Sequence, residues 1–404
     1  MTRASLDRRR FPTVWADIDL HALGRNLTTL RRHLPVGMAV YGVVKADAYG
    51  HGAPAVARAL QHAGVDGLVV ADLEEGTALR RVGIERPVLV LDPPLPQQAT
   101  ALAAQGLAAT VTSVAEAEQL ARAAVRTDTA APVPVHVRAD TGFGGLNAPP
   151  GSLLDLLAAI ARTPALRLAG LYTHLSGPGS MAGLKELERF GALVAQADAA
   201  GLLPPLVHAL SGSALADAAL ATAAQRIGCT AVRCGSLLYG LRAMPGSMPF
   251  PYTPVMAVKA RIIRLATLEP GDRIPGDAAL PVSRQTRAAL VPIGFSDAHH
   301  LLRLAEGSLL VRGQEVPILG TPFMSALLAD VSTVPDVQPG DEVVLLGSQG
   351  GAVLSAEALA ERSGLPPGAI PLLGPRVARH YRTVPGAAAE PETARAPSRE
   401  PAPA

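Results

Sequence analysis

The chain has 404 residues, enough for two or three domains, and it is 49% hydrophobic but only 3% aromatic, as expected of many closely packed helices. Its 36 basic and 34 acidic side chains leave a net charge of +2, which gives no reason to expect nucleic acid or an anionic membrane as a partner. The two cysteines, Cys229 and Cys234, are too few for a disulfide framework and are expected to be buried free thiols.

The N-terminal residues carry no recognisable export signal. Residues 1–10 are basic, but no apolar segment follows them, and no stretch of 18 or more residues is apolar enough to span a membrane. We therefore expect a flexible N-terminus over 1–10 and a cytoplasmic protein.

Between about residues 38 and 240, short apolar runs alternate with helical stretches rich in Ala and Leu. Non-alternating, Val- and Leu-rich runs are typical of strands that are buried on both faces. Eight such runs occur, at 38–45, 67–71, 87–91, 107–112, 133–139, 168–173, 206–210 and 231–235, with helices predicted at 53–63, 74–82, 114–124 and 181–199 among others. Eight strands with helical crossovers predict an α/β fold, a (β/α)8 barrel over residues 11–245, and a doubly wound sheet is the alternative.

The pattern of residue types changes after the predicted barrel. Residues 241–253 hold three prolines and are typical of a linker. Residues 254–382 alternate apolar and polar positions and contain PGD turn signals at 270–272 and 339–341, which predicts a C-terminal, mainly-β domain over 246–383. The Ala-, Pro- and Glu-rich tail over 384–404 is predicted to be disordered.

The active site of such a barrel lies at the C-terminal ends of its strands. The first predicted strand ends in Lys45, one of three lysines in the chain. A lysine in a partly desolvated barrel mouth is suited to form an imine with an aldehyde cofactor. The alternative is a lysine whose ammonium group reaches solvent from a strand end.

Other strand ends carry compatible chemistry. The sixth strand is followed by His174, and the eighth contains Arg233 and is followed by Gly235 and Ser236. Small residues after a strand expose backbone N–H groups that can hold a phosphate, and the loop from Ser211 to Ser213 is a second candidate for this role. Each polar residue taken singly could instead make an ordinary hydrogen bond at the rim, but together they predict a pyridoxal 5′-phosphate (PLP) site.

The segment VVKADAYGHGA, residues 43–53, resembles the PLP-lysine motif of alanine racemases, and the resemblance extends from Phe11 to Tyr381. It implies PLP as cofactor, an amino acid as substrate, and no metal. It also implies an N-terminal PLP barrel, a C-terminal β domain and a head-to-tail homodimer whose active sites draw on both subunits.

The resemblance assigns roles to individual residues. Lys45 would hold PLP and act as the base on one face of the substrate Cα. Arg233 would face the pyridine nitrogen and leave it unprotonated, because an arginine cannot give up its proton, and His174 would orient Arg233. Met324 matches a methionine whose backbone contacts the substrate in the partner's site. The residues that would bind the phosphate are Tyr49, Ser211, Ser213, Gly235 and Ser236.

Several positions depart from the family. Gly276 stands where the family has its catalytic tyrosine, and Gly145 stands where an arginine contacts the cofactor and the substrate carboxylate. Arg138 replaces a lysine that is often carbamylated, and Pro375 replaces a tyrosine that touches the phosphate. The residues listed above that hold PLP in the barrel are retained, whereas those that handle the substrate, especially from the partner's β domain, have changed.

Three functions stay open on the sequence. The first is an amino-acid racemase with reduced or altered activity, in which Asp277, His299 or His300 replaces the missing base, although each is also explained as a turn or loop residue. The second is a PLP enzyme that needs a base on one face only, for decarboxylation, aldol cleavage or elimination. The third is a PLP-binding protein without turnover. Arg233 favours the first, because the decarboxylase relatives would carry an acidic residue at that position.

Overall fold

The computed structural model describes residues 12–127, 131–142, 146–176, 181–241, 251–274, 281–302 and 307–382. The N-terminal residues 1–10 and the tail 384–404, which we predicted to be flexible and disordered, lie outside these ranges. Most of the predicted linker, residues 242–250, lies outside them as well.

Eight parallel strands in the described residues form the first sheet, in the order β8-β7-β6-β5-β4-β3-β2-β9. Its two end strands meet, because Thr230 N donates to Val207 O (2.8 Å) and Arg233 N donates to Leu210 O (3.0 Å). The predicted barrel is therefore confirmed, and the doubly wound sheet is rejected. The strands are β2 (Ala39–Val43), β3 (Gly67–Val70), β4 (Val88–Val90), β5 (Ala108–Val111), β6 (Val133–Arg138), β7 (Leu166–Tyr172), β8 (Leu206–His208) and β9 (Ala231–Cys234).

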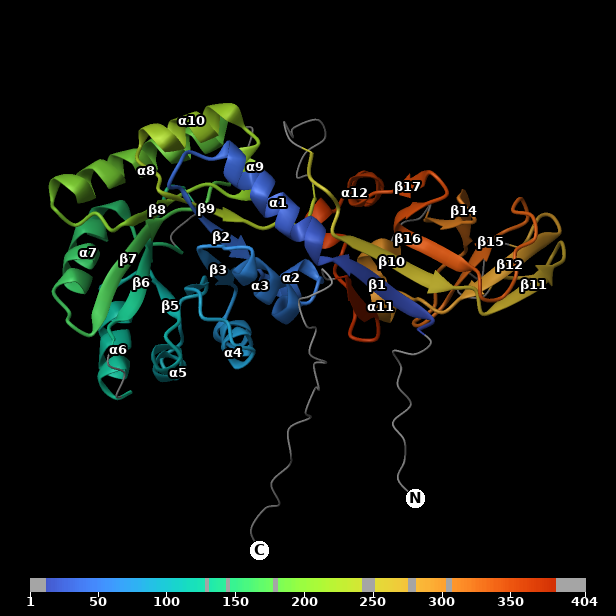
Figure 1. The fold of residues 1–404 in the computed structure, drawn as a ribbon, viewed down its shortest axis with the longest axis horizontal. Coiled ribbons are helices and arrows are strands. Elements are labelled where there is room, and N and C mark those ends of the chain that lie inside the picture. Colours follow the sequence, from blue (N-terminus) through green and yellow to red (C-terminus); the bar gives the residue numbers. More distant parts are fainter. Residues whose placement is uncertain are drawn as a thin grey trace, which may run out of the picture.

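Helices follow the strands and cover the outside of the barrel (Figure 1). Several of them begin at side-chain caps that accept a hydrogen bond from the first turn, for example Asp72 from Glu75 N and Ser113 from Glu116 N. The helices are α1 (Leu20–His33), α3 (Ala53–His62), α4 (Leu73–Arg81), α5 (Ala99–Ala104), α6 (Val114–Val125), α7 (Leu153–Ala161), α8 (Met181–Ala199), α9 (Gly212–Leu215) and α10 (Ala218–Arg226). Among the described helices, none is long and apolar enough to cross a membrane.

The barrel interior is a packed core with a polar part. Alternate residues of each strand point inward, and Tyr41, Val43, Val69 and Leu89 belong to one interior cluster with Ala108 and Ala231. Glycine leaves space for a ring side chain here. A Cβ atom at Gly170 would lie only 2.2 Å from His136 Nδ1, which is too close. The two cysteines are buried and free, as predicted.

The second sheet confirms the predicted mainly-β domain. Its described strands run in the order β11-β12-β15-β14-β13-β16-β10-β1-β18, with β17 paired to β16. Gly271 and Gly340, the central residues of the two PGD turns, both have φ of +95°. The elements are β1 (Val14–Asp19), β10 (Met256–Arg261), β11 (Arg264–Leu268), β12 (Thr286–Val291), α11 (Phe295–Leu302), β13 (Ser308–Val311), β14 (Gln314–Leu319), β15 (Leu327–Asp330), β16 (Glu342–Gln349), β17 (Ala352–Leu354), α12 (Ala356–Ser363) and β18 (Ala378–Arg382).

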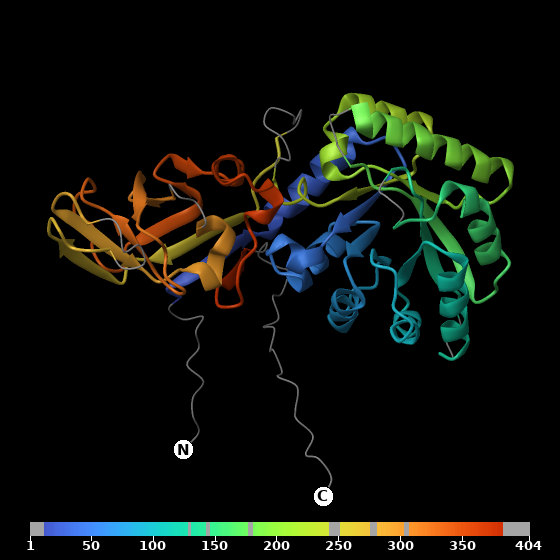
Figure 2. The same cartoon turned by 180° about the vertical axis from the view of Figure 1, so that it is seen from behind.

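The first described strand, β1, lies in this second sheet, although we predicted residues 11–245 to form the barrel. β1 pairs antiparallel with β10 and parallel with β18. It runs directly into α1, which begins at Asp19, whose carboxylate accepts from His21 N and Ala22 N (both 2.9 Å). The described part of the chain thus begins in the β sheet and crosses to the barrel, which joins the two halves seen side by side in Figures 1 and 2.

Candidate active site

Lys45 stands at the start of an unusual turn. β2 ends at Val43 rather than at residue 45, and one further hydrogen bond to β3 follows it, from Val44 N to Val69 O (2.8 Å). The next four residues, Ala46 to Tyr49, all have φ of +53° or +54°. Because the left-handed conformation costs a non-glycine residue roughly 1–2 kcal/mol, this short segment, α2 (Lys45–Tyr49), must be held by its surroundings.

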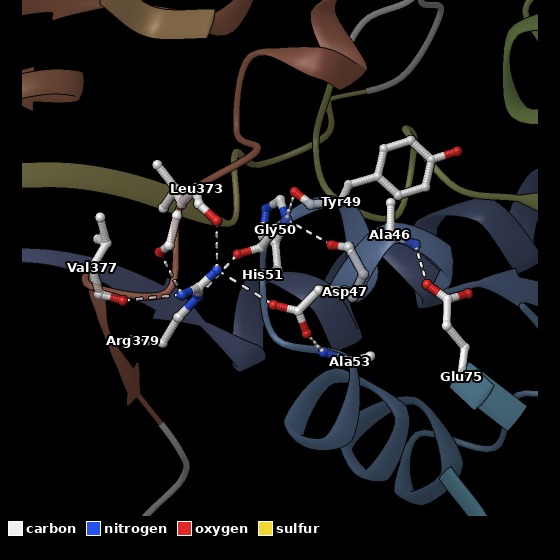
Figure 3. Close-up of polar contacts among 12 residues, drawn as sticks. Ala46, Asp47, Tyr49, Gly50, His51, Ala53, Glu75, Leu373, Val377 and Arg379 are labelled. Carbon is white, nitrogen blue, oxygen red and sulfur yellow. Dashed lines mark hydrogen bonds and ion pairs between the residues drawn. The ribbon is translucent and has the colours of Figure 1, made fainter. Parts of the chain in front are cut away.

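Side chains from three elements hold this turn (Figure 3). Glu75 of α4 accepts from Ala46 N (2.6 Å), and Asp47 accepts from Ala53 N (2.8 Å). Arg379 of β18 donates to Gly50 O (3.2 Å) and to the Asp47 carboxylate (3.3 Å). The second domain therefore braces the segment that carries Lys45.

The side chain of Tyr49 extends from this turn to the end of β9. A Cβ on Gly235 would lie 2.7 Å from Tyr49 Oη, so only glycine leaves room for the phenol there. The ring of Tyr49 packs on Tyr239 (5.2 Å between centroids), and Tyr239 in turn donates to Val43 O (2.8 Å). The phenol of Tyr49 is thereby placed against the loop that follows β9.

The loops after β8 and β9 adjoin each other. Ser211 forms an isolated β-bridge with Arg233, and Ser236 Oγ lies 3.5 Å from the position of a Cβ on Gly212. The predicted phosphate residues Tyr49, Ser211, Gly235 and Ser236 therefore come together in one place. The side chain of Ser213 lies outside the described part of the chain.

Arg233 is 5% exposed and is held by neutral partners. Its Nη2 donates to Thr173 O (2.8 Å), and its Nη1 lies 2.5 Å from His208 Nδ1. The guanidinium also lies 4.9 Å from the centre of the Tyr172 ring. Burial lowers the pKa of Arg233 to about 10, so the group remains charged at neutral pH.

Two histidines continue this network into the barrel. Burial, and then the charge of Arg233, lower the pKa of His208 well below its usual value, so its imidazole is neutral. Because Nδ1 of His208 accepts from Arg233, Nε2 carries the proton and donates to Nδ1 of His136 (3.0 Å). The polar network therefore runs from the mouth of the barrel into its interior.

His174 lies at the mouth of the barrel with three basic side chains. The residue is exposed at that opening, yet the walls around it desolvate the imidazole and lower its pKa to about 4; the charges of Arg233, Arg138 and Lys45 also lower it. The predicted role of His174 in orienting Arg233 stays a prediction, since the contacts described above connect Arg233 to Thr173 and His208.

Met324 lies in the second domain, with its side chain 69% exposed. Its carbonyl accepts from Ser296 N (2.9 Å) and Ser296 Oγ (2.7 Å), which fixes the backbone at this point. Gly145, Gly276 and Asp277 lie outside the described residues, as do the side chains of His299 and His300.

Several residues of this site are not among those predicted from the sequence. His208 sits within a predicted strand, and an imidazole inside an otherwise apolar barrel strand is a usable signal. Glu75, Tyr239 and Arg379 act through the turn after Lys45, and local sequence carries no sign of contacts between such distant segments.

The donor set fits PLP. A lysine at the barrel mouth can bind its aldehyde, and the space kept open by Gly235 beside Tyr49 and the serine loops suits its phosphate. A charged Arg233 at the same mouth suits the ring nitrogen. None of these positions carries a group that would repel an anionic cofactor.

Comparison with known proteins agrees with this description. The family model for the N-terminal domain of alanine racemase matches residues 18–243, and that for the C-terminal domain matches residues 255–381. The chain is 37% identical over 361 residues to an alanine racemase of Sorangium cellulosum, covering 86% of this chain and 93% of that protein. An alanine racemase of Geobacter sp. strain M21 is 34% identical, with 88% and 94% covered.

Solved structures show the same likeness. An alanine racemase of Clostridium difficile 630 superposes with a TM-score of 0.84 at 26% identity, covering 92% of this chain and 96% of that one. The alanine racemase of Bacillus anthracis with bound L-Ala-P gives a TM-score of 0.82 at 28% identity, covering 93% and 96%. Because both domains match over nearly all the described residues, the chain belongs to the alanine racemase family.

Proposed function

We propose that this protein is a PLP-dependent isomerase of the amino-acid racemase type, which acts at the Cα of an amino acid. The observation that carries the proposal is the placement of Lys45. It opens a braced left-handed turn at the mouth of a closed barrel, and Tyr49, Gly235 and Arg233 lie at the same mouth.

PLP, when bound, supplies an electron sink that makes the Cα–H bond of an amino acid acidic. Lys45 would hold it covalently and would take the Cα proton, or return it, on one face of the substrate. Arg233 would face the ring nitrogen and, with a pKa of about 10, keep its own proton. The phosphate would be bound by Tyr49, Ser211, Ser213, Gly235 and Ser236.

The chain differs from the family in how it would handle the substrate. Gly276 and Gly145 stand at the positions of the catalytic tyrosine and the carboxylate-binding arginine. The loss of one general acid–base group typically costs about 10²–10⁴ in rate. We therefore expect alanine racemisation to be slow, and the smaller residues favour a substrate larger than alanine.

We also propose a homodimer that works in the cytoplasm. Met324 is exposed on the second domain, and Leu146 is exposed just beyond the end of β6 at the barrel mouth, 69% and 79% respectively. A head-to-tail pairing would cover both apolar side chains and bring Met324 to the partner's barrel mouth.

The experiment that tests the cofactor assignment is borohydride reduction of the purified protein followed by peptide mapping. The pyridoxyl group should be found on Lys45, and Lys45→Ala should lose covalent PLP and its visible absorbance. Labelling of Lys185 or Lys259, or equal covalent PLP in Lys45→Ala, would reject the proposed site.

A further inference from the structure

A hollow lies at the end of the barrel opposite Lys45, and the proposed function makes no use of it. Its volume is about 370 Å³, which falls within the roughly 300–1,000 Å³ of small-molecule sites. Its wall includes the first residues of β4, β5 and β8, which are Val88, Ala108 and Leu206. Because parallel strands all begin at the same end of a barrel, the hollow belongs to the face where the strands start.

Two ring side chains from opposite sides of the barrel line this hollow. Tyr41 of β2 and His136 of β6 are 6% and 2% exposed, and their ring centres lie 6.4 Å apart. A Cβ atom at Gly67 would lie 2.4 Å from the ring of Tyr41, and one at Gly170 would lie 2.2 Å from His136 Nδ1. Both rings are therefore packed into fixed positions, with glycine leaving the space that each one fills.

The hydrogen-bond chain from Arg233 determines what His136 offers to a ligand. Nε2 of His208 donates to Nδ1 of His136 (3.0 Å), so the neutral ring of His136 carries its own proton on Nε2. Within the described part of the chain, neither this N–H nor the hydroxyl of Tyr41 has a hydrogen-bond partner. Burial raises the pKa of Tyr41 and lowers that of His136 to about 3, so both groups are neutral donors at pH 7.

The charged side chains in the wall of the hollow leave an excess of one positive charge. They are Arg80, Arg167 and Glu85. The guanidinium of Arg80 is bound to the backbone, since it donates to the carbonyls of Ile84, Arg86, Gln105 and Gly106. Arg167 is therefore the cation whose donors are available to a ligand.

Arg167 acts on both rings of the hollow. It is the second residue of β7 and is exposed, and besides burial its charge lowers the pKa of His136 and of Tyr41. Asp66 also acts on Tyr41 and raises its pKa, but its carboxylate is bound by the guanidinium of Arg31 and by a backbone amide (both 2.8 Å). Donors from three strands thus meet beside one uncompensated positive charge, which favours a ligand with a single negative charge.

We propose that this hollow binds a short-chain monocarboxylate, which accepts hydrogen bonds from Tyr41, His136 and Arg167. The hydrocarbon part of the ligand lies against the apolar wall formed by the starts of β4, β5 and β8. The inference is independent of the proposed function, because none of these residues is assigned to the cofactor or to the amino-acid substrate. It gives the barrel a second ligand site, at the end away from Lys45.

The test uses the full-length holoprotein labelled with fluorotyrosine, in which the fluorine NMR resonance of Tyr41 is assigned with Tyr41→Phe. Butyrate is the probe, and butyramide is its neutral analogue of the same shape. Butyrate should shift the Tyr41 resonance saturably with a Kd of about 1–10 mM, and butyramide should bind about tenfold more weakly because it has no charge. The resonance of Tyr49 reports separately on butyrate that binds at the mouth.

Arg167→Gln should raise the Kd for butyrate at the Tyr41 resonance about tenfold, because the variant loses the charged donor. Arg167→Lys, which keeps the charge, should recover part of the affinity. The matched control is Arg86→Gln, since Arg86 is a neighbouring exposed arginine whose side chain is outside the lining of the hollow. This control should leave butyrate binding unchanged.

Three results would overturn the proposal: no saturable shift of the Tyr41 resonance, equal affinity for butyrate and butyramide, or an unchanged Kd in Arg167→Gln. Tighter binding of inorganic phosphate than of butyrate at the same resonance would overturn the assignment to a monocarboxylate. None of these readouts depends on turnover, so the site is tested separately from the racemase.

Discussion

Arg233 and His208 show how a buried charge is kept in this barrel. The guanidinium has no carboxylate among its described contacts, and it is held by two carbonyl oxygens and a neutral imidazole. Such an arrangement keeps the positive charge available to a ligand, whereas a carboxylate partner would neutralise it. The contact with Arg233 sets the tautomer of His208, whose Nε2 then donates its proton to Nδ1 of His136.

Replacing His208 with leucine should destabilise the protein. The buried Arg233 loses an acceptor, and leaving a buried donor unsatisfied costs about 1–3 kcal/mol. Urea unfolding should show this loss in the free energy of unfolding. His62→Leu, which removes an exposed imidazole from α3, should show none. Equal losses in both variants would contradict the role given to His208.

Gly276→Tyr should raise the rate of alanine racemisation. Gly276 lies outside the described residues, so this prediction rests on our inference from the sequence that Gly276 stands at the position of the family's second acid–base group. The increase should fall within the roughly 10²–10⁴-fold that such a group contributes. A wild-type turnover number well above about 10 s⁻¹, the median for enzymes, would show that the departure is already compensated.

Among the elements, the left-handed turn after β2 matters most to the site. Four consecutive non-glycine residues adopt a conformation that each disfavours, and contacts from α4 and β18 offset the cost. The close packing extends along the motif: a Cβ on Gly50 would lie 2.1 Å from Pro371 O, and one on Gly52 would lie 1.9 Å from Tyr381 Oη. The β domain therefore serves as a brace for the lysine of its own barrel.

Arg379→Ala should weaken PLP binding, because it removes the donor that ties the turn to β18. One or two ionic hydrogen bonds at this partly exposed site predict an increase of about tenfold in the PLP Kd, measured by absorbance on dialysis. Arg382→Ala is the matched control, since Arg382 lies on the same strand and, among the described residues, its ion pair is with Asp17 of β1 (3.4 Å) rather than with the turn. Indistinguishable affinities would mean that β18 does not brace the turn.

The sequence predicts the barrel elements well because strands buried on both faces leave apolar runs that local pattern can detect. All eight predicted runs contain the observed strands or overlap them within two residues. The turn at Ala46–Tyr49 could not be predicted, since nothing in four non-glycine residues signals a left-handed conformation. β1 could not be assigned to the second sheet, because its partners β10 and β18 lie more than 230 residues away.

The whole molecule should lose stability on acidification through three buried imidazoles. Burial lowers the pKa of His51 to about 4 and of His136 to about 3, and that of His208 lies well below its usual value. In the unfolded chain these groups take up protons below about pH 6.5, and in the folded chain they do not, so stability falls as pH drops from 6.5 toward 4.

At pH 5.5, each of these imidazoles should lower the free energy of unfolding by about 1.4 kcal/mol relative to neutral pH. Urea unfolding of the holoprotein at pH 7.5 and 5.5 measures the sum. His136→Asn should flatten the dependence on pH, whereas an unchanged dependence would mean that His136 is charged in the folded state.

The proposed assembly predicts a dimer of twice the 41.5 kDa chain mass in sedimentation at micromolar concentration. Obligate homodimers bury more than about 2,000 Å² in total. Met324→Asp should shift the protein toward monomer, because it places a charge in the expected contact. Val36→Asp, at an exposed position before β2 and at the other end of the barrel, should not. A wild-type monomer would reject the shared site.

The most direct test of the account is incubation of the PLP-loaded protein with a panel of L- and D-amino acids in D₂O, with product and deuterium followed by chiral chromatography and mass spectrometry. We predict that at least one amino acid gains deuterium at Cα and loses optical purity, and that alanine reacts slowly. The Lys45→Ala variant should catalyse neither the exchange at Cα nor the loss of optical purity. Release of CO₂ or an aldehyde from the same substrates without formation of the other enantiomer, or no exchange at Cα with any of them, would contradict a racemase built around Lys45.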